Sequence, residues 1–166
     1  MRSPGDIRND AQYLIRPASE TDQAGILNCL AVAFERYRRD YTAQAFADTV
    51  LDPATFRERL QKMHILVATS ESESKSVGTI AGKCDGNEGH LRGMAVLPEW
   101  RGTGLAVRLL LTMEAWLRGQ GYNRVTLDTT LPLKAAIRFY EKNGYIRSSR
   151  ESDFFGMRLV EYVKEL

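Results

Sequence analysis

The stretch from Leu91 to Ala106, LRGMAVLPEWRGTGLA, joins a short apolar segment to a proline and a glycine-rich run that leads into an apolar helix pattern. The apolar segment is typical of a β-strand, and the residues after Gly104 are typical of a helix. Several backbone N–H groups at the first turn of a helix lack partners within it, and the helix dipole is positive there. Because Gly102, Gly104 and the small Ala106 leave the main chain open to a bulky anion, the stretch predicts a phosphate-binding turn.

The alternation of apolar residues fails once inside the predicted strand. Leu91 is followed by Met94 and Val96, so the pattern slips by one residue around Arg92-Gly93. A β-bulge explains such a slip. The bulge would splay this strand from a parallel neighbour and leave backbone groups near Met94 and Val96 unpaired, as a place for an extended ligand arm.

The N-terminal half predicts a strand, two helices and a meander. Tyr13–Ile15 is typical of a strand, and Ser19-x-x-Asp22 caps a helix whose apolar face extends to Tyr37. A second helix begins at Asp52-Pro53, with a cap residue before a proline. Three β-rich segments (65–68, 77–81 and 91–96) follow as consecutive antiparallel strands, the first two joined by a polar turn at 70–76.

The C-terminal half alternates helix and strand. A helix from Gly104 to about Arg118 is expected to bury Leu105, Leu109, Met113 and Trp116, followed by a strand at 125–127, a helix at 133–142 and a strand at 154–160. The predicted fold class is α/β in the α+β sense: a mixed, largely antiparallel sheet with flanking helices and a splayed, bulged central strand. Residues 1–12 are expected to be a flexible tail and residues 13–166 a single domain.

Composition excludes several classes of protein. The 166 residues are 43% hydrophobic with a net charge of +2, and no apolar run approaches the roughly 20 residues of a membrane span. We therefore expect a soluble, cytoplasmic protein that binds neither nucleic acid nor membrane. Cys29 and Cys84 stand alone, without metal-ligand spacing, so we expect two small core residues and no metal site.

Two motifs resemble the GNAT superfamily of N-acetyltransferases. The segment MAVLPEWRGTGLA (94–106) contains the family's R/Q-x-x-G-x-G/A core, filled by Arg101, Gly104 and Ala106. The segment AIRFYEKNGY (136–145) is similar to the family's A-I-x-L-Y-E-K-x-G-F. The two motifs have the family's order and separation, and the resemblance covers about residues 13 to 162.

The resemblance implies an enzyme that moves an acetyl group from acetyl-CoA to a primary amine, of a small molecule or a peptide, by direct attack through a tetrahedral intermediate. It places the proton donor to the leaving thiolate at Tyr140. It assigns the pantetheine to Met94, Ala95 and Val96, and the pyrophosphate to the amides of Arg101, Gly102, Thr103, Gly104, Leu105 and Ala106. A catalytically silent acyl-CoA sensor or interaction module is the alternative, and a homodimer is left open.

Two positions depart from the family's pattern. Leu133 stands where the family often has an asparagine that binds the cofactor, and His90 stands where it commonly has a glutamate. Acyl transfer needs a neutral amine, and an imidazole of pKa ~6.5 can remove its proton, so His90 is a candidate base. Glu88, on the same strand face if alternation holds, and Asp128, near the end of the next strand, are the other candidates besides solvent.

The acceptor site has weaker signals. Tyr37, Tyr41 and Phe46 lie between the two predicted helices, a region that covers the substrate groove in such folds. They could contact the amine or merely pack. Asp128 and the two threonines after it, Thr129 and Thr130, are expected to add polar contacts from the mouth of the sheet.

Overall fold

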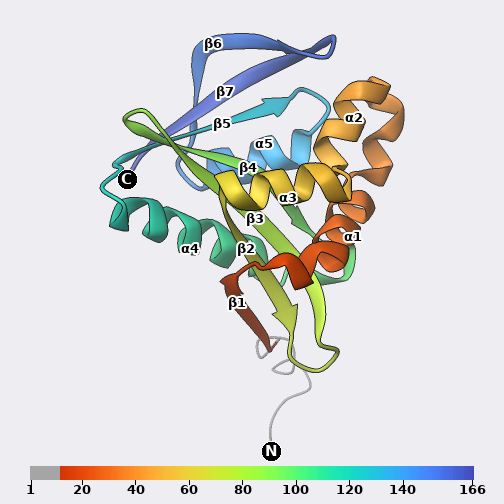
Figure 1. The fold of residues 1–166 in the computed structure, drawn as a ribbon. Coiled ribbons are helices and arrows are strands. Elements are labelled where there is room, and N and C mark those ends of the chain that lie inside the picture. The colour runs from red at the N-terminus through yellow and green to blue at the C-terminus, as the bar shows by residue number, and fades with distance from the viewer. Residues whose placement is uncertain (1–11) are drawn as a thin grey trace, which may run out of the picture.

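A seven-stranded mixed sheet organises residues 12–166, the part of the chain that the computed structural model describes (Figure 1). Its strand order is β1-β2-β3-β4-β5-β7-β6. Every neighbouring pair is antiparallel except β4 and β5, which are parallel, so the predicted mixed sheet is confirmed. The strands are β1 (Tyr13–Pro17), β2 (His64–Ser70), β3 (Lys75–Asp85), β4 (Glu88–Val96), β5 (Arg124–Thr130), β6 (Ile146–Phe154) and β7 (Met157–Glu165). The tail predicted at 1–12 lies, apart from Gln12, outside the described residues.

Helices cover both faces of the sheet. Ser76 and Gly78 of β3 are two residues apart and would share one face of a regular strand. The β2–β3 register shifts between them, so Ser76 lies against Gly25 of α1 and Gly78 lies against Leu109 of α4 on the opposite face. The α-helices are α1 (Gln23–Phe34), α2 (Ala43–Val50), α3 (Pro53–Lys62), α4 (Leu105–Gly119) and α5 (Lys134–Lys142), and the 3-10 turns are η2 (Glu20–Asp22), η3 (Glu35–Asp40) and η4 (Pro98–Trp100). Helices α2 and α3 pack with α1, and none of the helices over residues 12–166 is long and apolar enough to cross a membrane.

The face of α4 that packs on the sheet follows the predicted helical spacing. Leu105, Leu109 and Met113 are buried completely. Glycines on the sheet let the helix approach closely: a Cβ on Gly82 would lie 2.5 Å from the sulfur of Met113. Trp116 is only half-buried at the rim of this face, where its ring stacks on His64 with centroids 4.1 Å apart.

The central strand is bulged and splayed, as predicted. Thr79 pairs with Ala95 but Ala81 pairs with Arg92, so the single residue between them on β3 faces both Gly93 and Met94. Gly93 adopts φ +60°, a backbone conformation that favours glycine. Pairing of β4 with β5 covers only residues 89–91 and 125–127. Beyond that point the two parallel strands separate.

The final strand predicted at 154–160 exists as β7, but its predicted start is wrong because residues 154–156 belong to the end of β6 and a hairpin turn. Strand β6 ends at Phe154, the next two residues have φ +50° and +87°, and β7 begins at Met157. Two consecutive residues at positive φ form the tight turn that joins twisted antiparallel strands. The first of them is Phe155, which is not a usual turn residue, and only Gly156 signals the turn in the sequence.

Three further expectations needed correction. The sequence patterns did not predict α2, whose N-cap Thr42 accepts a hydrogen bond from the amide of Ala45 (3.2 Å). The first helix ends at Phe34, and the chain continues to Asp40 in 3-10 geometry. Cys29 is buried, as expected, but Cys84 is exposed at the end of β3, where no core covers it.

Candidate active site

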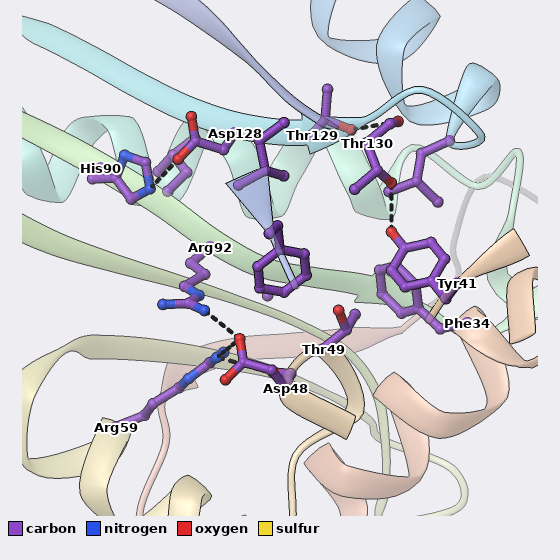
Figure 2. Close-up of a pocket in the computed structure, with 15 residues that line it drawn as sticks. Phe34, Tyr41, Asp48, Thr49, Arg59, His90, Arg92, Asp128, Thr129 and Thr130 are labelled. Carbon is purple, nitrogen blue, oxygen red and sulfur yellow. Dashed lines mark hydrogen bonds and ion pairs between the residues drawn. The ribbon is translucent and has the colours of Figure 1, made fainter. Parts of the chain in front are cut away.

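A cavity of about 240 Å³ opens where β4 and β5 separate (Figure 2). The two strands supply its floor, and α1, α2 and α3 contribute side chains from above the sheet. The lining residues are Phe34, Tyr41, Asp48, Thr49, Arg59, His90, Leu91, Arg92, Gly93, Asp128, Thr129, Thr130, Leu133, Phe154 and Leu159. The structure therefore brings His90 of β4 together with Asp128, Thr129 and Thr130 of β5.

His90 and Asp128 form one end of the cavity. The Nδ1 atom of His90 shares a 2.8 Å hydrogen bond with the hydroxyl of Thr126, a buried residue of β5. The opposite nitrogen, Nε2, lies 3.7 Å from Oδ2 of Asp128. That separation is too long for a direct hydrogen bond but short enough for one small donor group to contact both atoms.

Burial sets the protonation of this pair. Desolvation lowers the pKa of His90 below its ordinary value, and the negative charge of Asp128 only partly opposes this effect. Desolvation raises the pKa of the Asp128 carboxyl, and the neighbouring His90 partly offsets that rise. The His90 imidazole is therefore neutral at pH 7, with a nitrogen facing the cavity.

Two arginines and one aspartate form a second charged group of the cavity. Arg92 Nη2 donates to Oδ2 of Asp48 at 2.7 Å, and Arg59 Nη2 lies 3.7 Å from the same oxygen. Arg59 also donates to the backbone carbonyl of Asp48 (3.1 Å), and its side chain is only 14% exposed. Burial lowers the pKa of Arg59 to about 10, and the charge of Arg92 acts in the same direction.

An aromatic and hydroxyl group forms a third part of the wall. The hydroxyls of Tyr41 and Thr130 share a 2.6 Å hydrogen bond, which ties the segment before α2 to the end of β5. The rings of Tyr41 and Phe34 meet edge to face, with centroids 6.5 Å apart. Tyr41 thus both lines the cavity and packs on Phe34.

The glycine-rich turn leads into α4 with the geometry of an anion site. Gly102 has φ +74°, and Gly104, the N-cap of α4, has φ +83°. The first helical hydrogen bond runs from the Arg108 amide to the Gly104 carbonyl (3.1 Å), so the three preceding amides point out of the helix end. The hydroxyl of Thr103 donates to the Trp100 carbonyl (2.6 Å). A Cβ on either glycine would meet no atom of residues 12–166 within 4 Å. The turn is thus open to solvent and presents free amides of the kind that bind anions at helix N-termini.

Tyr140 reaches the splayed part of β4 from α5. Its hydroxyl donates to the sulfur of Met94, the residue directly after Gly93, at 3.4 Å. The ring is buried and packs edge to face against Tyr145, with centroids 5.6 Å apart. Burial raises the pKa of Tyr140, so its hydroxyl keeps its proton at neutral pH.

Three residues predicted near the site lie elsewhere. Glu88, at the start of β4, pairs with Arg124 at 3.2 Å and does not line the cavity. Tyr37 lies outside the lining, with its hydroxyl bonded to Arg36 (2.5 Å). Phe46 is buried behind Tyr41, with ring centroids 6.3 Å apart.

The sequence patterns missed four polar residues of the cavity: Asp48, Thr49, Arg59 and Arg92. A signal existed for Arg92, because it lies two positions after His90 and so shares its strand face. The others come from α2 and α3, whose packing over the sheet was not foreseen.

Comparison with known proteins agrees with this architecture. The model of the acetyltransferase (GNAT) family matches residues 29–145. Acetyltransferase plu1384 of Photorhabdus laumondii subsp. laumondii is 34% identical over 95 residues, which are 57% of this chain and 66% of that protein.

Solved structures share the fold. A PaiA N-acetyltransferase of Thermoplasma acidophilum, in complex with coenzyme A, superposes with a TM-score of 0.78 at 18% identity, over 93% of this chain and 99% of that one. A GNAT-family acetyltransferase of Staphylococcus aureus Mu50 gives 0.76 at 17% identity, over 93% and 99%. Since the family model spans most of the sheet, the bulged strand, the glycine turn and α5, this chain belongs to the acetyltransferase (GNAT) family.

Proposed function

We propose that the protein transfers an acetyl group from acetyl-CoA to a primary amine bound in the cavity. One observation carries the proposal: the bulge on β4 presents Gly93 to the cavity and the next residue, Met94, to the hydroxyl of Tyr140. A thioester lying along this part of the strand would meet an amine on one side and a proton donor on the other. Family membership and the coenzyme A bound by the Thermoplasma relative support the choice of donor.

The chain offers a continuous set of backbone groups for acetyl-CoA. The amides that open α4 would hold its pyrophosphate, with Gly102 and Gly104 giving access to the main chain. The edge of β4 beyond Leu91, which does not pair with β5, would hydrogen-bond the pantetheine near Met94, Ala95 and Val96. When bound, acetyl-CoA supplies the activated acyl carbon and a thiolate leaving group.

His90 would act as the base for the acceptor. With its proton on Nδ1, toward Thr126, the neutral imidazole presents a lone pair on Nε2. An ammonium group between Nε2 and Oδ2 of Asp128 can donate to both, because these atoms are 3.7 Å apart. Asp128 holds the charged amine, and His90 removes one proton so that the nitrogen can attack.

Tyr140 would donate the proton that the leaving sulfur needs. The nitrogen–carbon bond forms, the carbon–sulfur bond breaks, and the sulfur takes the hydroxyl proton of Tyr140. As the intermediate collapses, its nitrogen loses a second proton, which restores the Tyr140 hydroxyl through solvent. The first proton, held by His90, is released to solvent, so the products are an N-acetylated amine, free coenzyme A thiol and one proton. Leu133 lines the acceptor cavity, so no side-chain amide at this position assists the cofactor.

A thiol-release assay with acetyl-CoA across a panel of amines tests the proposal, alongside calorimetric titration with coenzyme A. We expect both binding and amine-dependent thiol release. Binding without release for every amine would favour the alternative of a silent acyl-CoA sensor. Absence of binding would contradict the assignment of the glycine turn.

A further inference from the structure

The charges around the cavity are separated into two groups (Figure 2). The carboxylate of Asp128 lies beside His90 at the end formed by β4 and β5. The guanidinium groups of Arg59 and Arg92 lie on another side, around Asp48 of α2. An acceptor that fills the space therefore meets a negative charge at one place and positive charges at another.

The arginine side carries an uncompensated charge. Two guanidinium groups share the single carboxylate of Asp48, and both lie nearest to the same oxygen, Oδ2. The other carboxylate among the lining residues, Asp128, lies with His90. Arg59, Arg92 and Asp48 together thus carry two positive charges and one negative charge. Water screens the excess positive charge poorly, because the Arg59 side chain is only 14% exposed.

The lowered pKa of Arg59 has the same cause. Burial and the positive charge of Arg92 lower it to about 10, and Asp48 offsets this only in part. A bound anion would stabilise the charged form of Arg59. Arginine side chains bind carboxylates well because their N–H groups match the two carboxylate oxygens.

We propose that the acceptor is a small primary amine that also carries a carboxylate, such as a free amino acid. This inference rests on the proposed acetyl transfer. The carboxylate binds at Arg59 and Arg92, while the ammonium group binds between Asp128 and His90. A single negative charge balances the one positive charge that these two arginines carry in excess of Asp48, whereas a phosphate dianion would exceed it. The volume of about 240 Å³ corresponds to roughly eight waters at ~30 Å³ each, enough for a molecule of this size.

Paired acceptors test the carboxylate directly. The common amino acids are assayed by thiol release, and leucine, phenylalanine and lysine are assayed beside their α-carboxamides. The amine of a carboxamide is less basic and so more often neutral, which favours the carboxamide if the carboxylate has no role. We expect the free amino acid to be the better acceptor by about 10- to 100-fold in kcat/KM. Equal or better use of the carboxamides would overturn the inference.

Two arginine variants test the binding site. Arg59→Met and Arg92→Gln should raise KM for the amino acid by about 10- to 100-fold and leave KM for its carboxamide and for acetyl-CoA unchanged. Arg57→Met, on the exposed face of the same helix, is the matched control and should behave as the parent protein. Arg92 is 41% exposed, so its variant should fold even if replacement of buried Arg59 unfolds the chain. Unchanged KM in Arg92→Gln would reject the site.

A binding measurement separates the inference from the proposed activity. Amino acids, their carboxamides and phosphoethanolamine are titrated by calorimetry into the protein saturated with coenzyme A. Binding of the amino acid that Arg92→Gln weakens supports the inference even if no amine is acetylated, an outcome that would reject only the acetyl transfer. Tighter binding of phosphoethanolamine, or equal binding of the carboxamide, would overturn the inference that the acceptor carries a carboxylate.

Discussion

Replacement of Tyr140 by phenylalanine separates its chemical role from its packing. Among residues 12–166, the hydroxyl donates only to the sulfur of Met94, at 3.4 Å, and a thioether is a weak acceptor. The phenylalanine ring would keep the edge-to-face contact with Tyr145. The variant should therefore lose little folding free energy.

The two expected magnitudes differ enough to be distinguished. Loss of one weak hydrogen bond changes the free energy of unfolding by less than about 1 kcal/mol, which shifts Tm by less than about 4 °C for a chain of this size. Loss of a positioned general acid typically lowers kcat by about 10²- to 10⁴-fold, or ~3 to 5 kcal/mol of barrier. A fall in kcat of this size with a nearly constant Tm would support proton donation by Tyr140.

The assay is thiol release at saturating acetyl-CoA, with thermal denaturation on the same samples. Tyr145→Phe is the matched control, because its hydroxyl donates to buried Glu114 of α4 at 2.9 Å and not to a residue of β4. We expect this control to lose about 1.5 to 3 kcal/mol of stability and to keep its kcat within a few-fold. If Tyr140→Phe turned over at the parent rate, Tyr140 would be a packing residue and the proposed acid would be wrong.

Three further perturbations address the turn, the base and the core. Gly104→Ala should cost about 1 kcal/mol of stability because of its φ of +83°, and it should weaken coenzyme A binding in calorimetry. Gly119→Ala should not affect binding, because Gly119 has no positive φ and a Cβ there would meet no atom of the described residues within 4 Å. The acid limb of the kcat/KM profile should lie below pH 6.5, because burial lowers the pKa of His90. Asp128→Asn should move this limb to lower pH, because the Asp128 carboxylate raises the pKa of His90. Glu114→Ala should cost about 3 kcal/mol in denaturant unfolding, because it removes the partner of Lys164 (2.9 Å).

Each of these has a clear contrary result. Equal coenzyme A affinity in the Gly104 and Gly119 variants would exclude the turn as the phosphate site. If the acid limb of the kcat/KM profile were unchanged in His90→Ala, the titration would belong to another group. An unfolding free energy unchanged in Glu114→Ala would mean that solvent replaces the carboxylate, since Lys164 is 22% exposed.

Local features of the backbone were predictable because they depend on neighbouring residues. The bulge follows from a slip in alternation around Gly93, and the observed φ of +60° there shows why glycine is needed. The start of α3 follows from Asp52 and Thr55, which exchange hydrogen bonds of 2.8 and 2.9 Å between side chain and backbone. The hairpin turn at Phe155 and Gly156 was not predicted, because only the glycine of this pair is a usual turn residue.

The sequence by itself determined the family, the bulged strand and the glycine turn, because each depends on residue types at fixed spacing along a short segment. Only the tertiary structure decided which side chains share the cavity. Asp48 and Arg59 lie on α2 and α3, and they meet Arg92 because those helices pack over the splayed strands. Glu88 shares a strand with His90, yet it pairs with Arg124 outside the cavity. Contacts between distant elements depend on packing and on competing charges, which no local pattern of residues encodes.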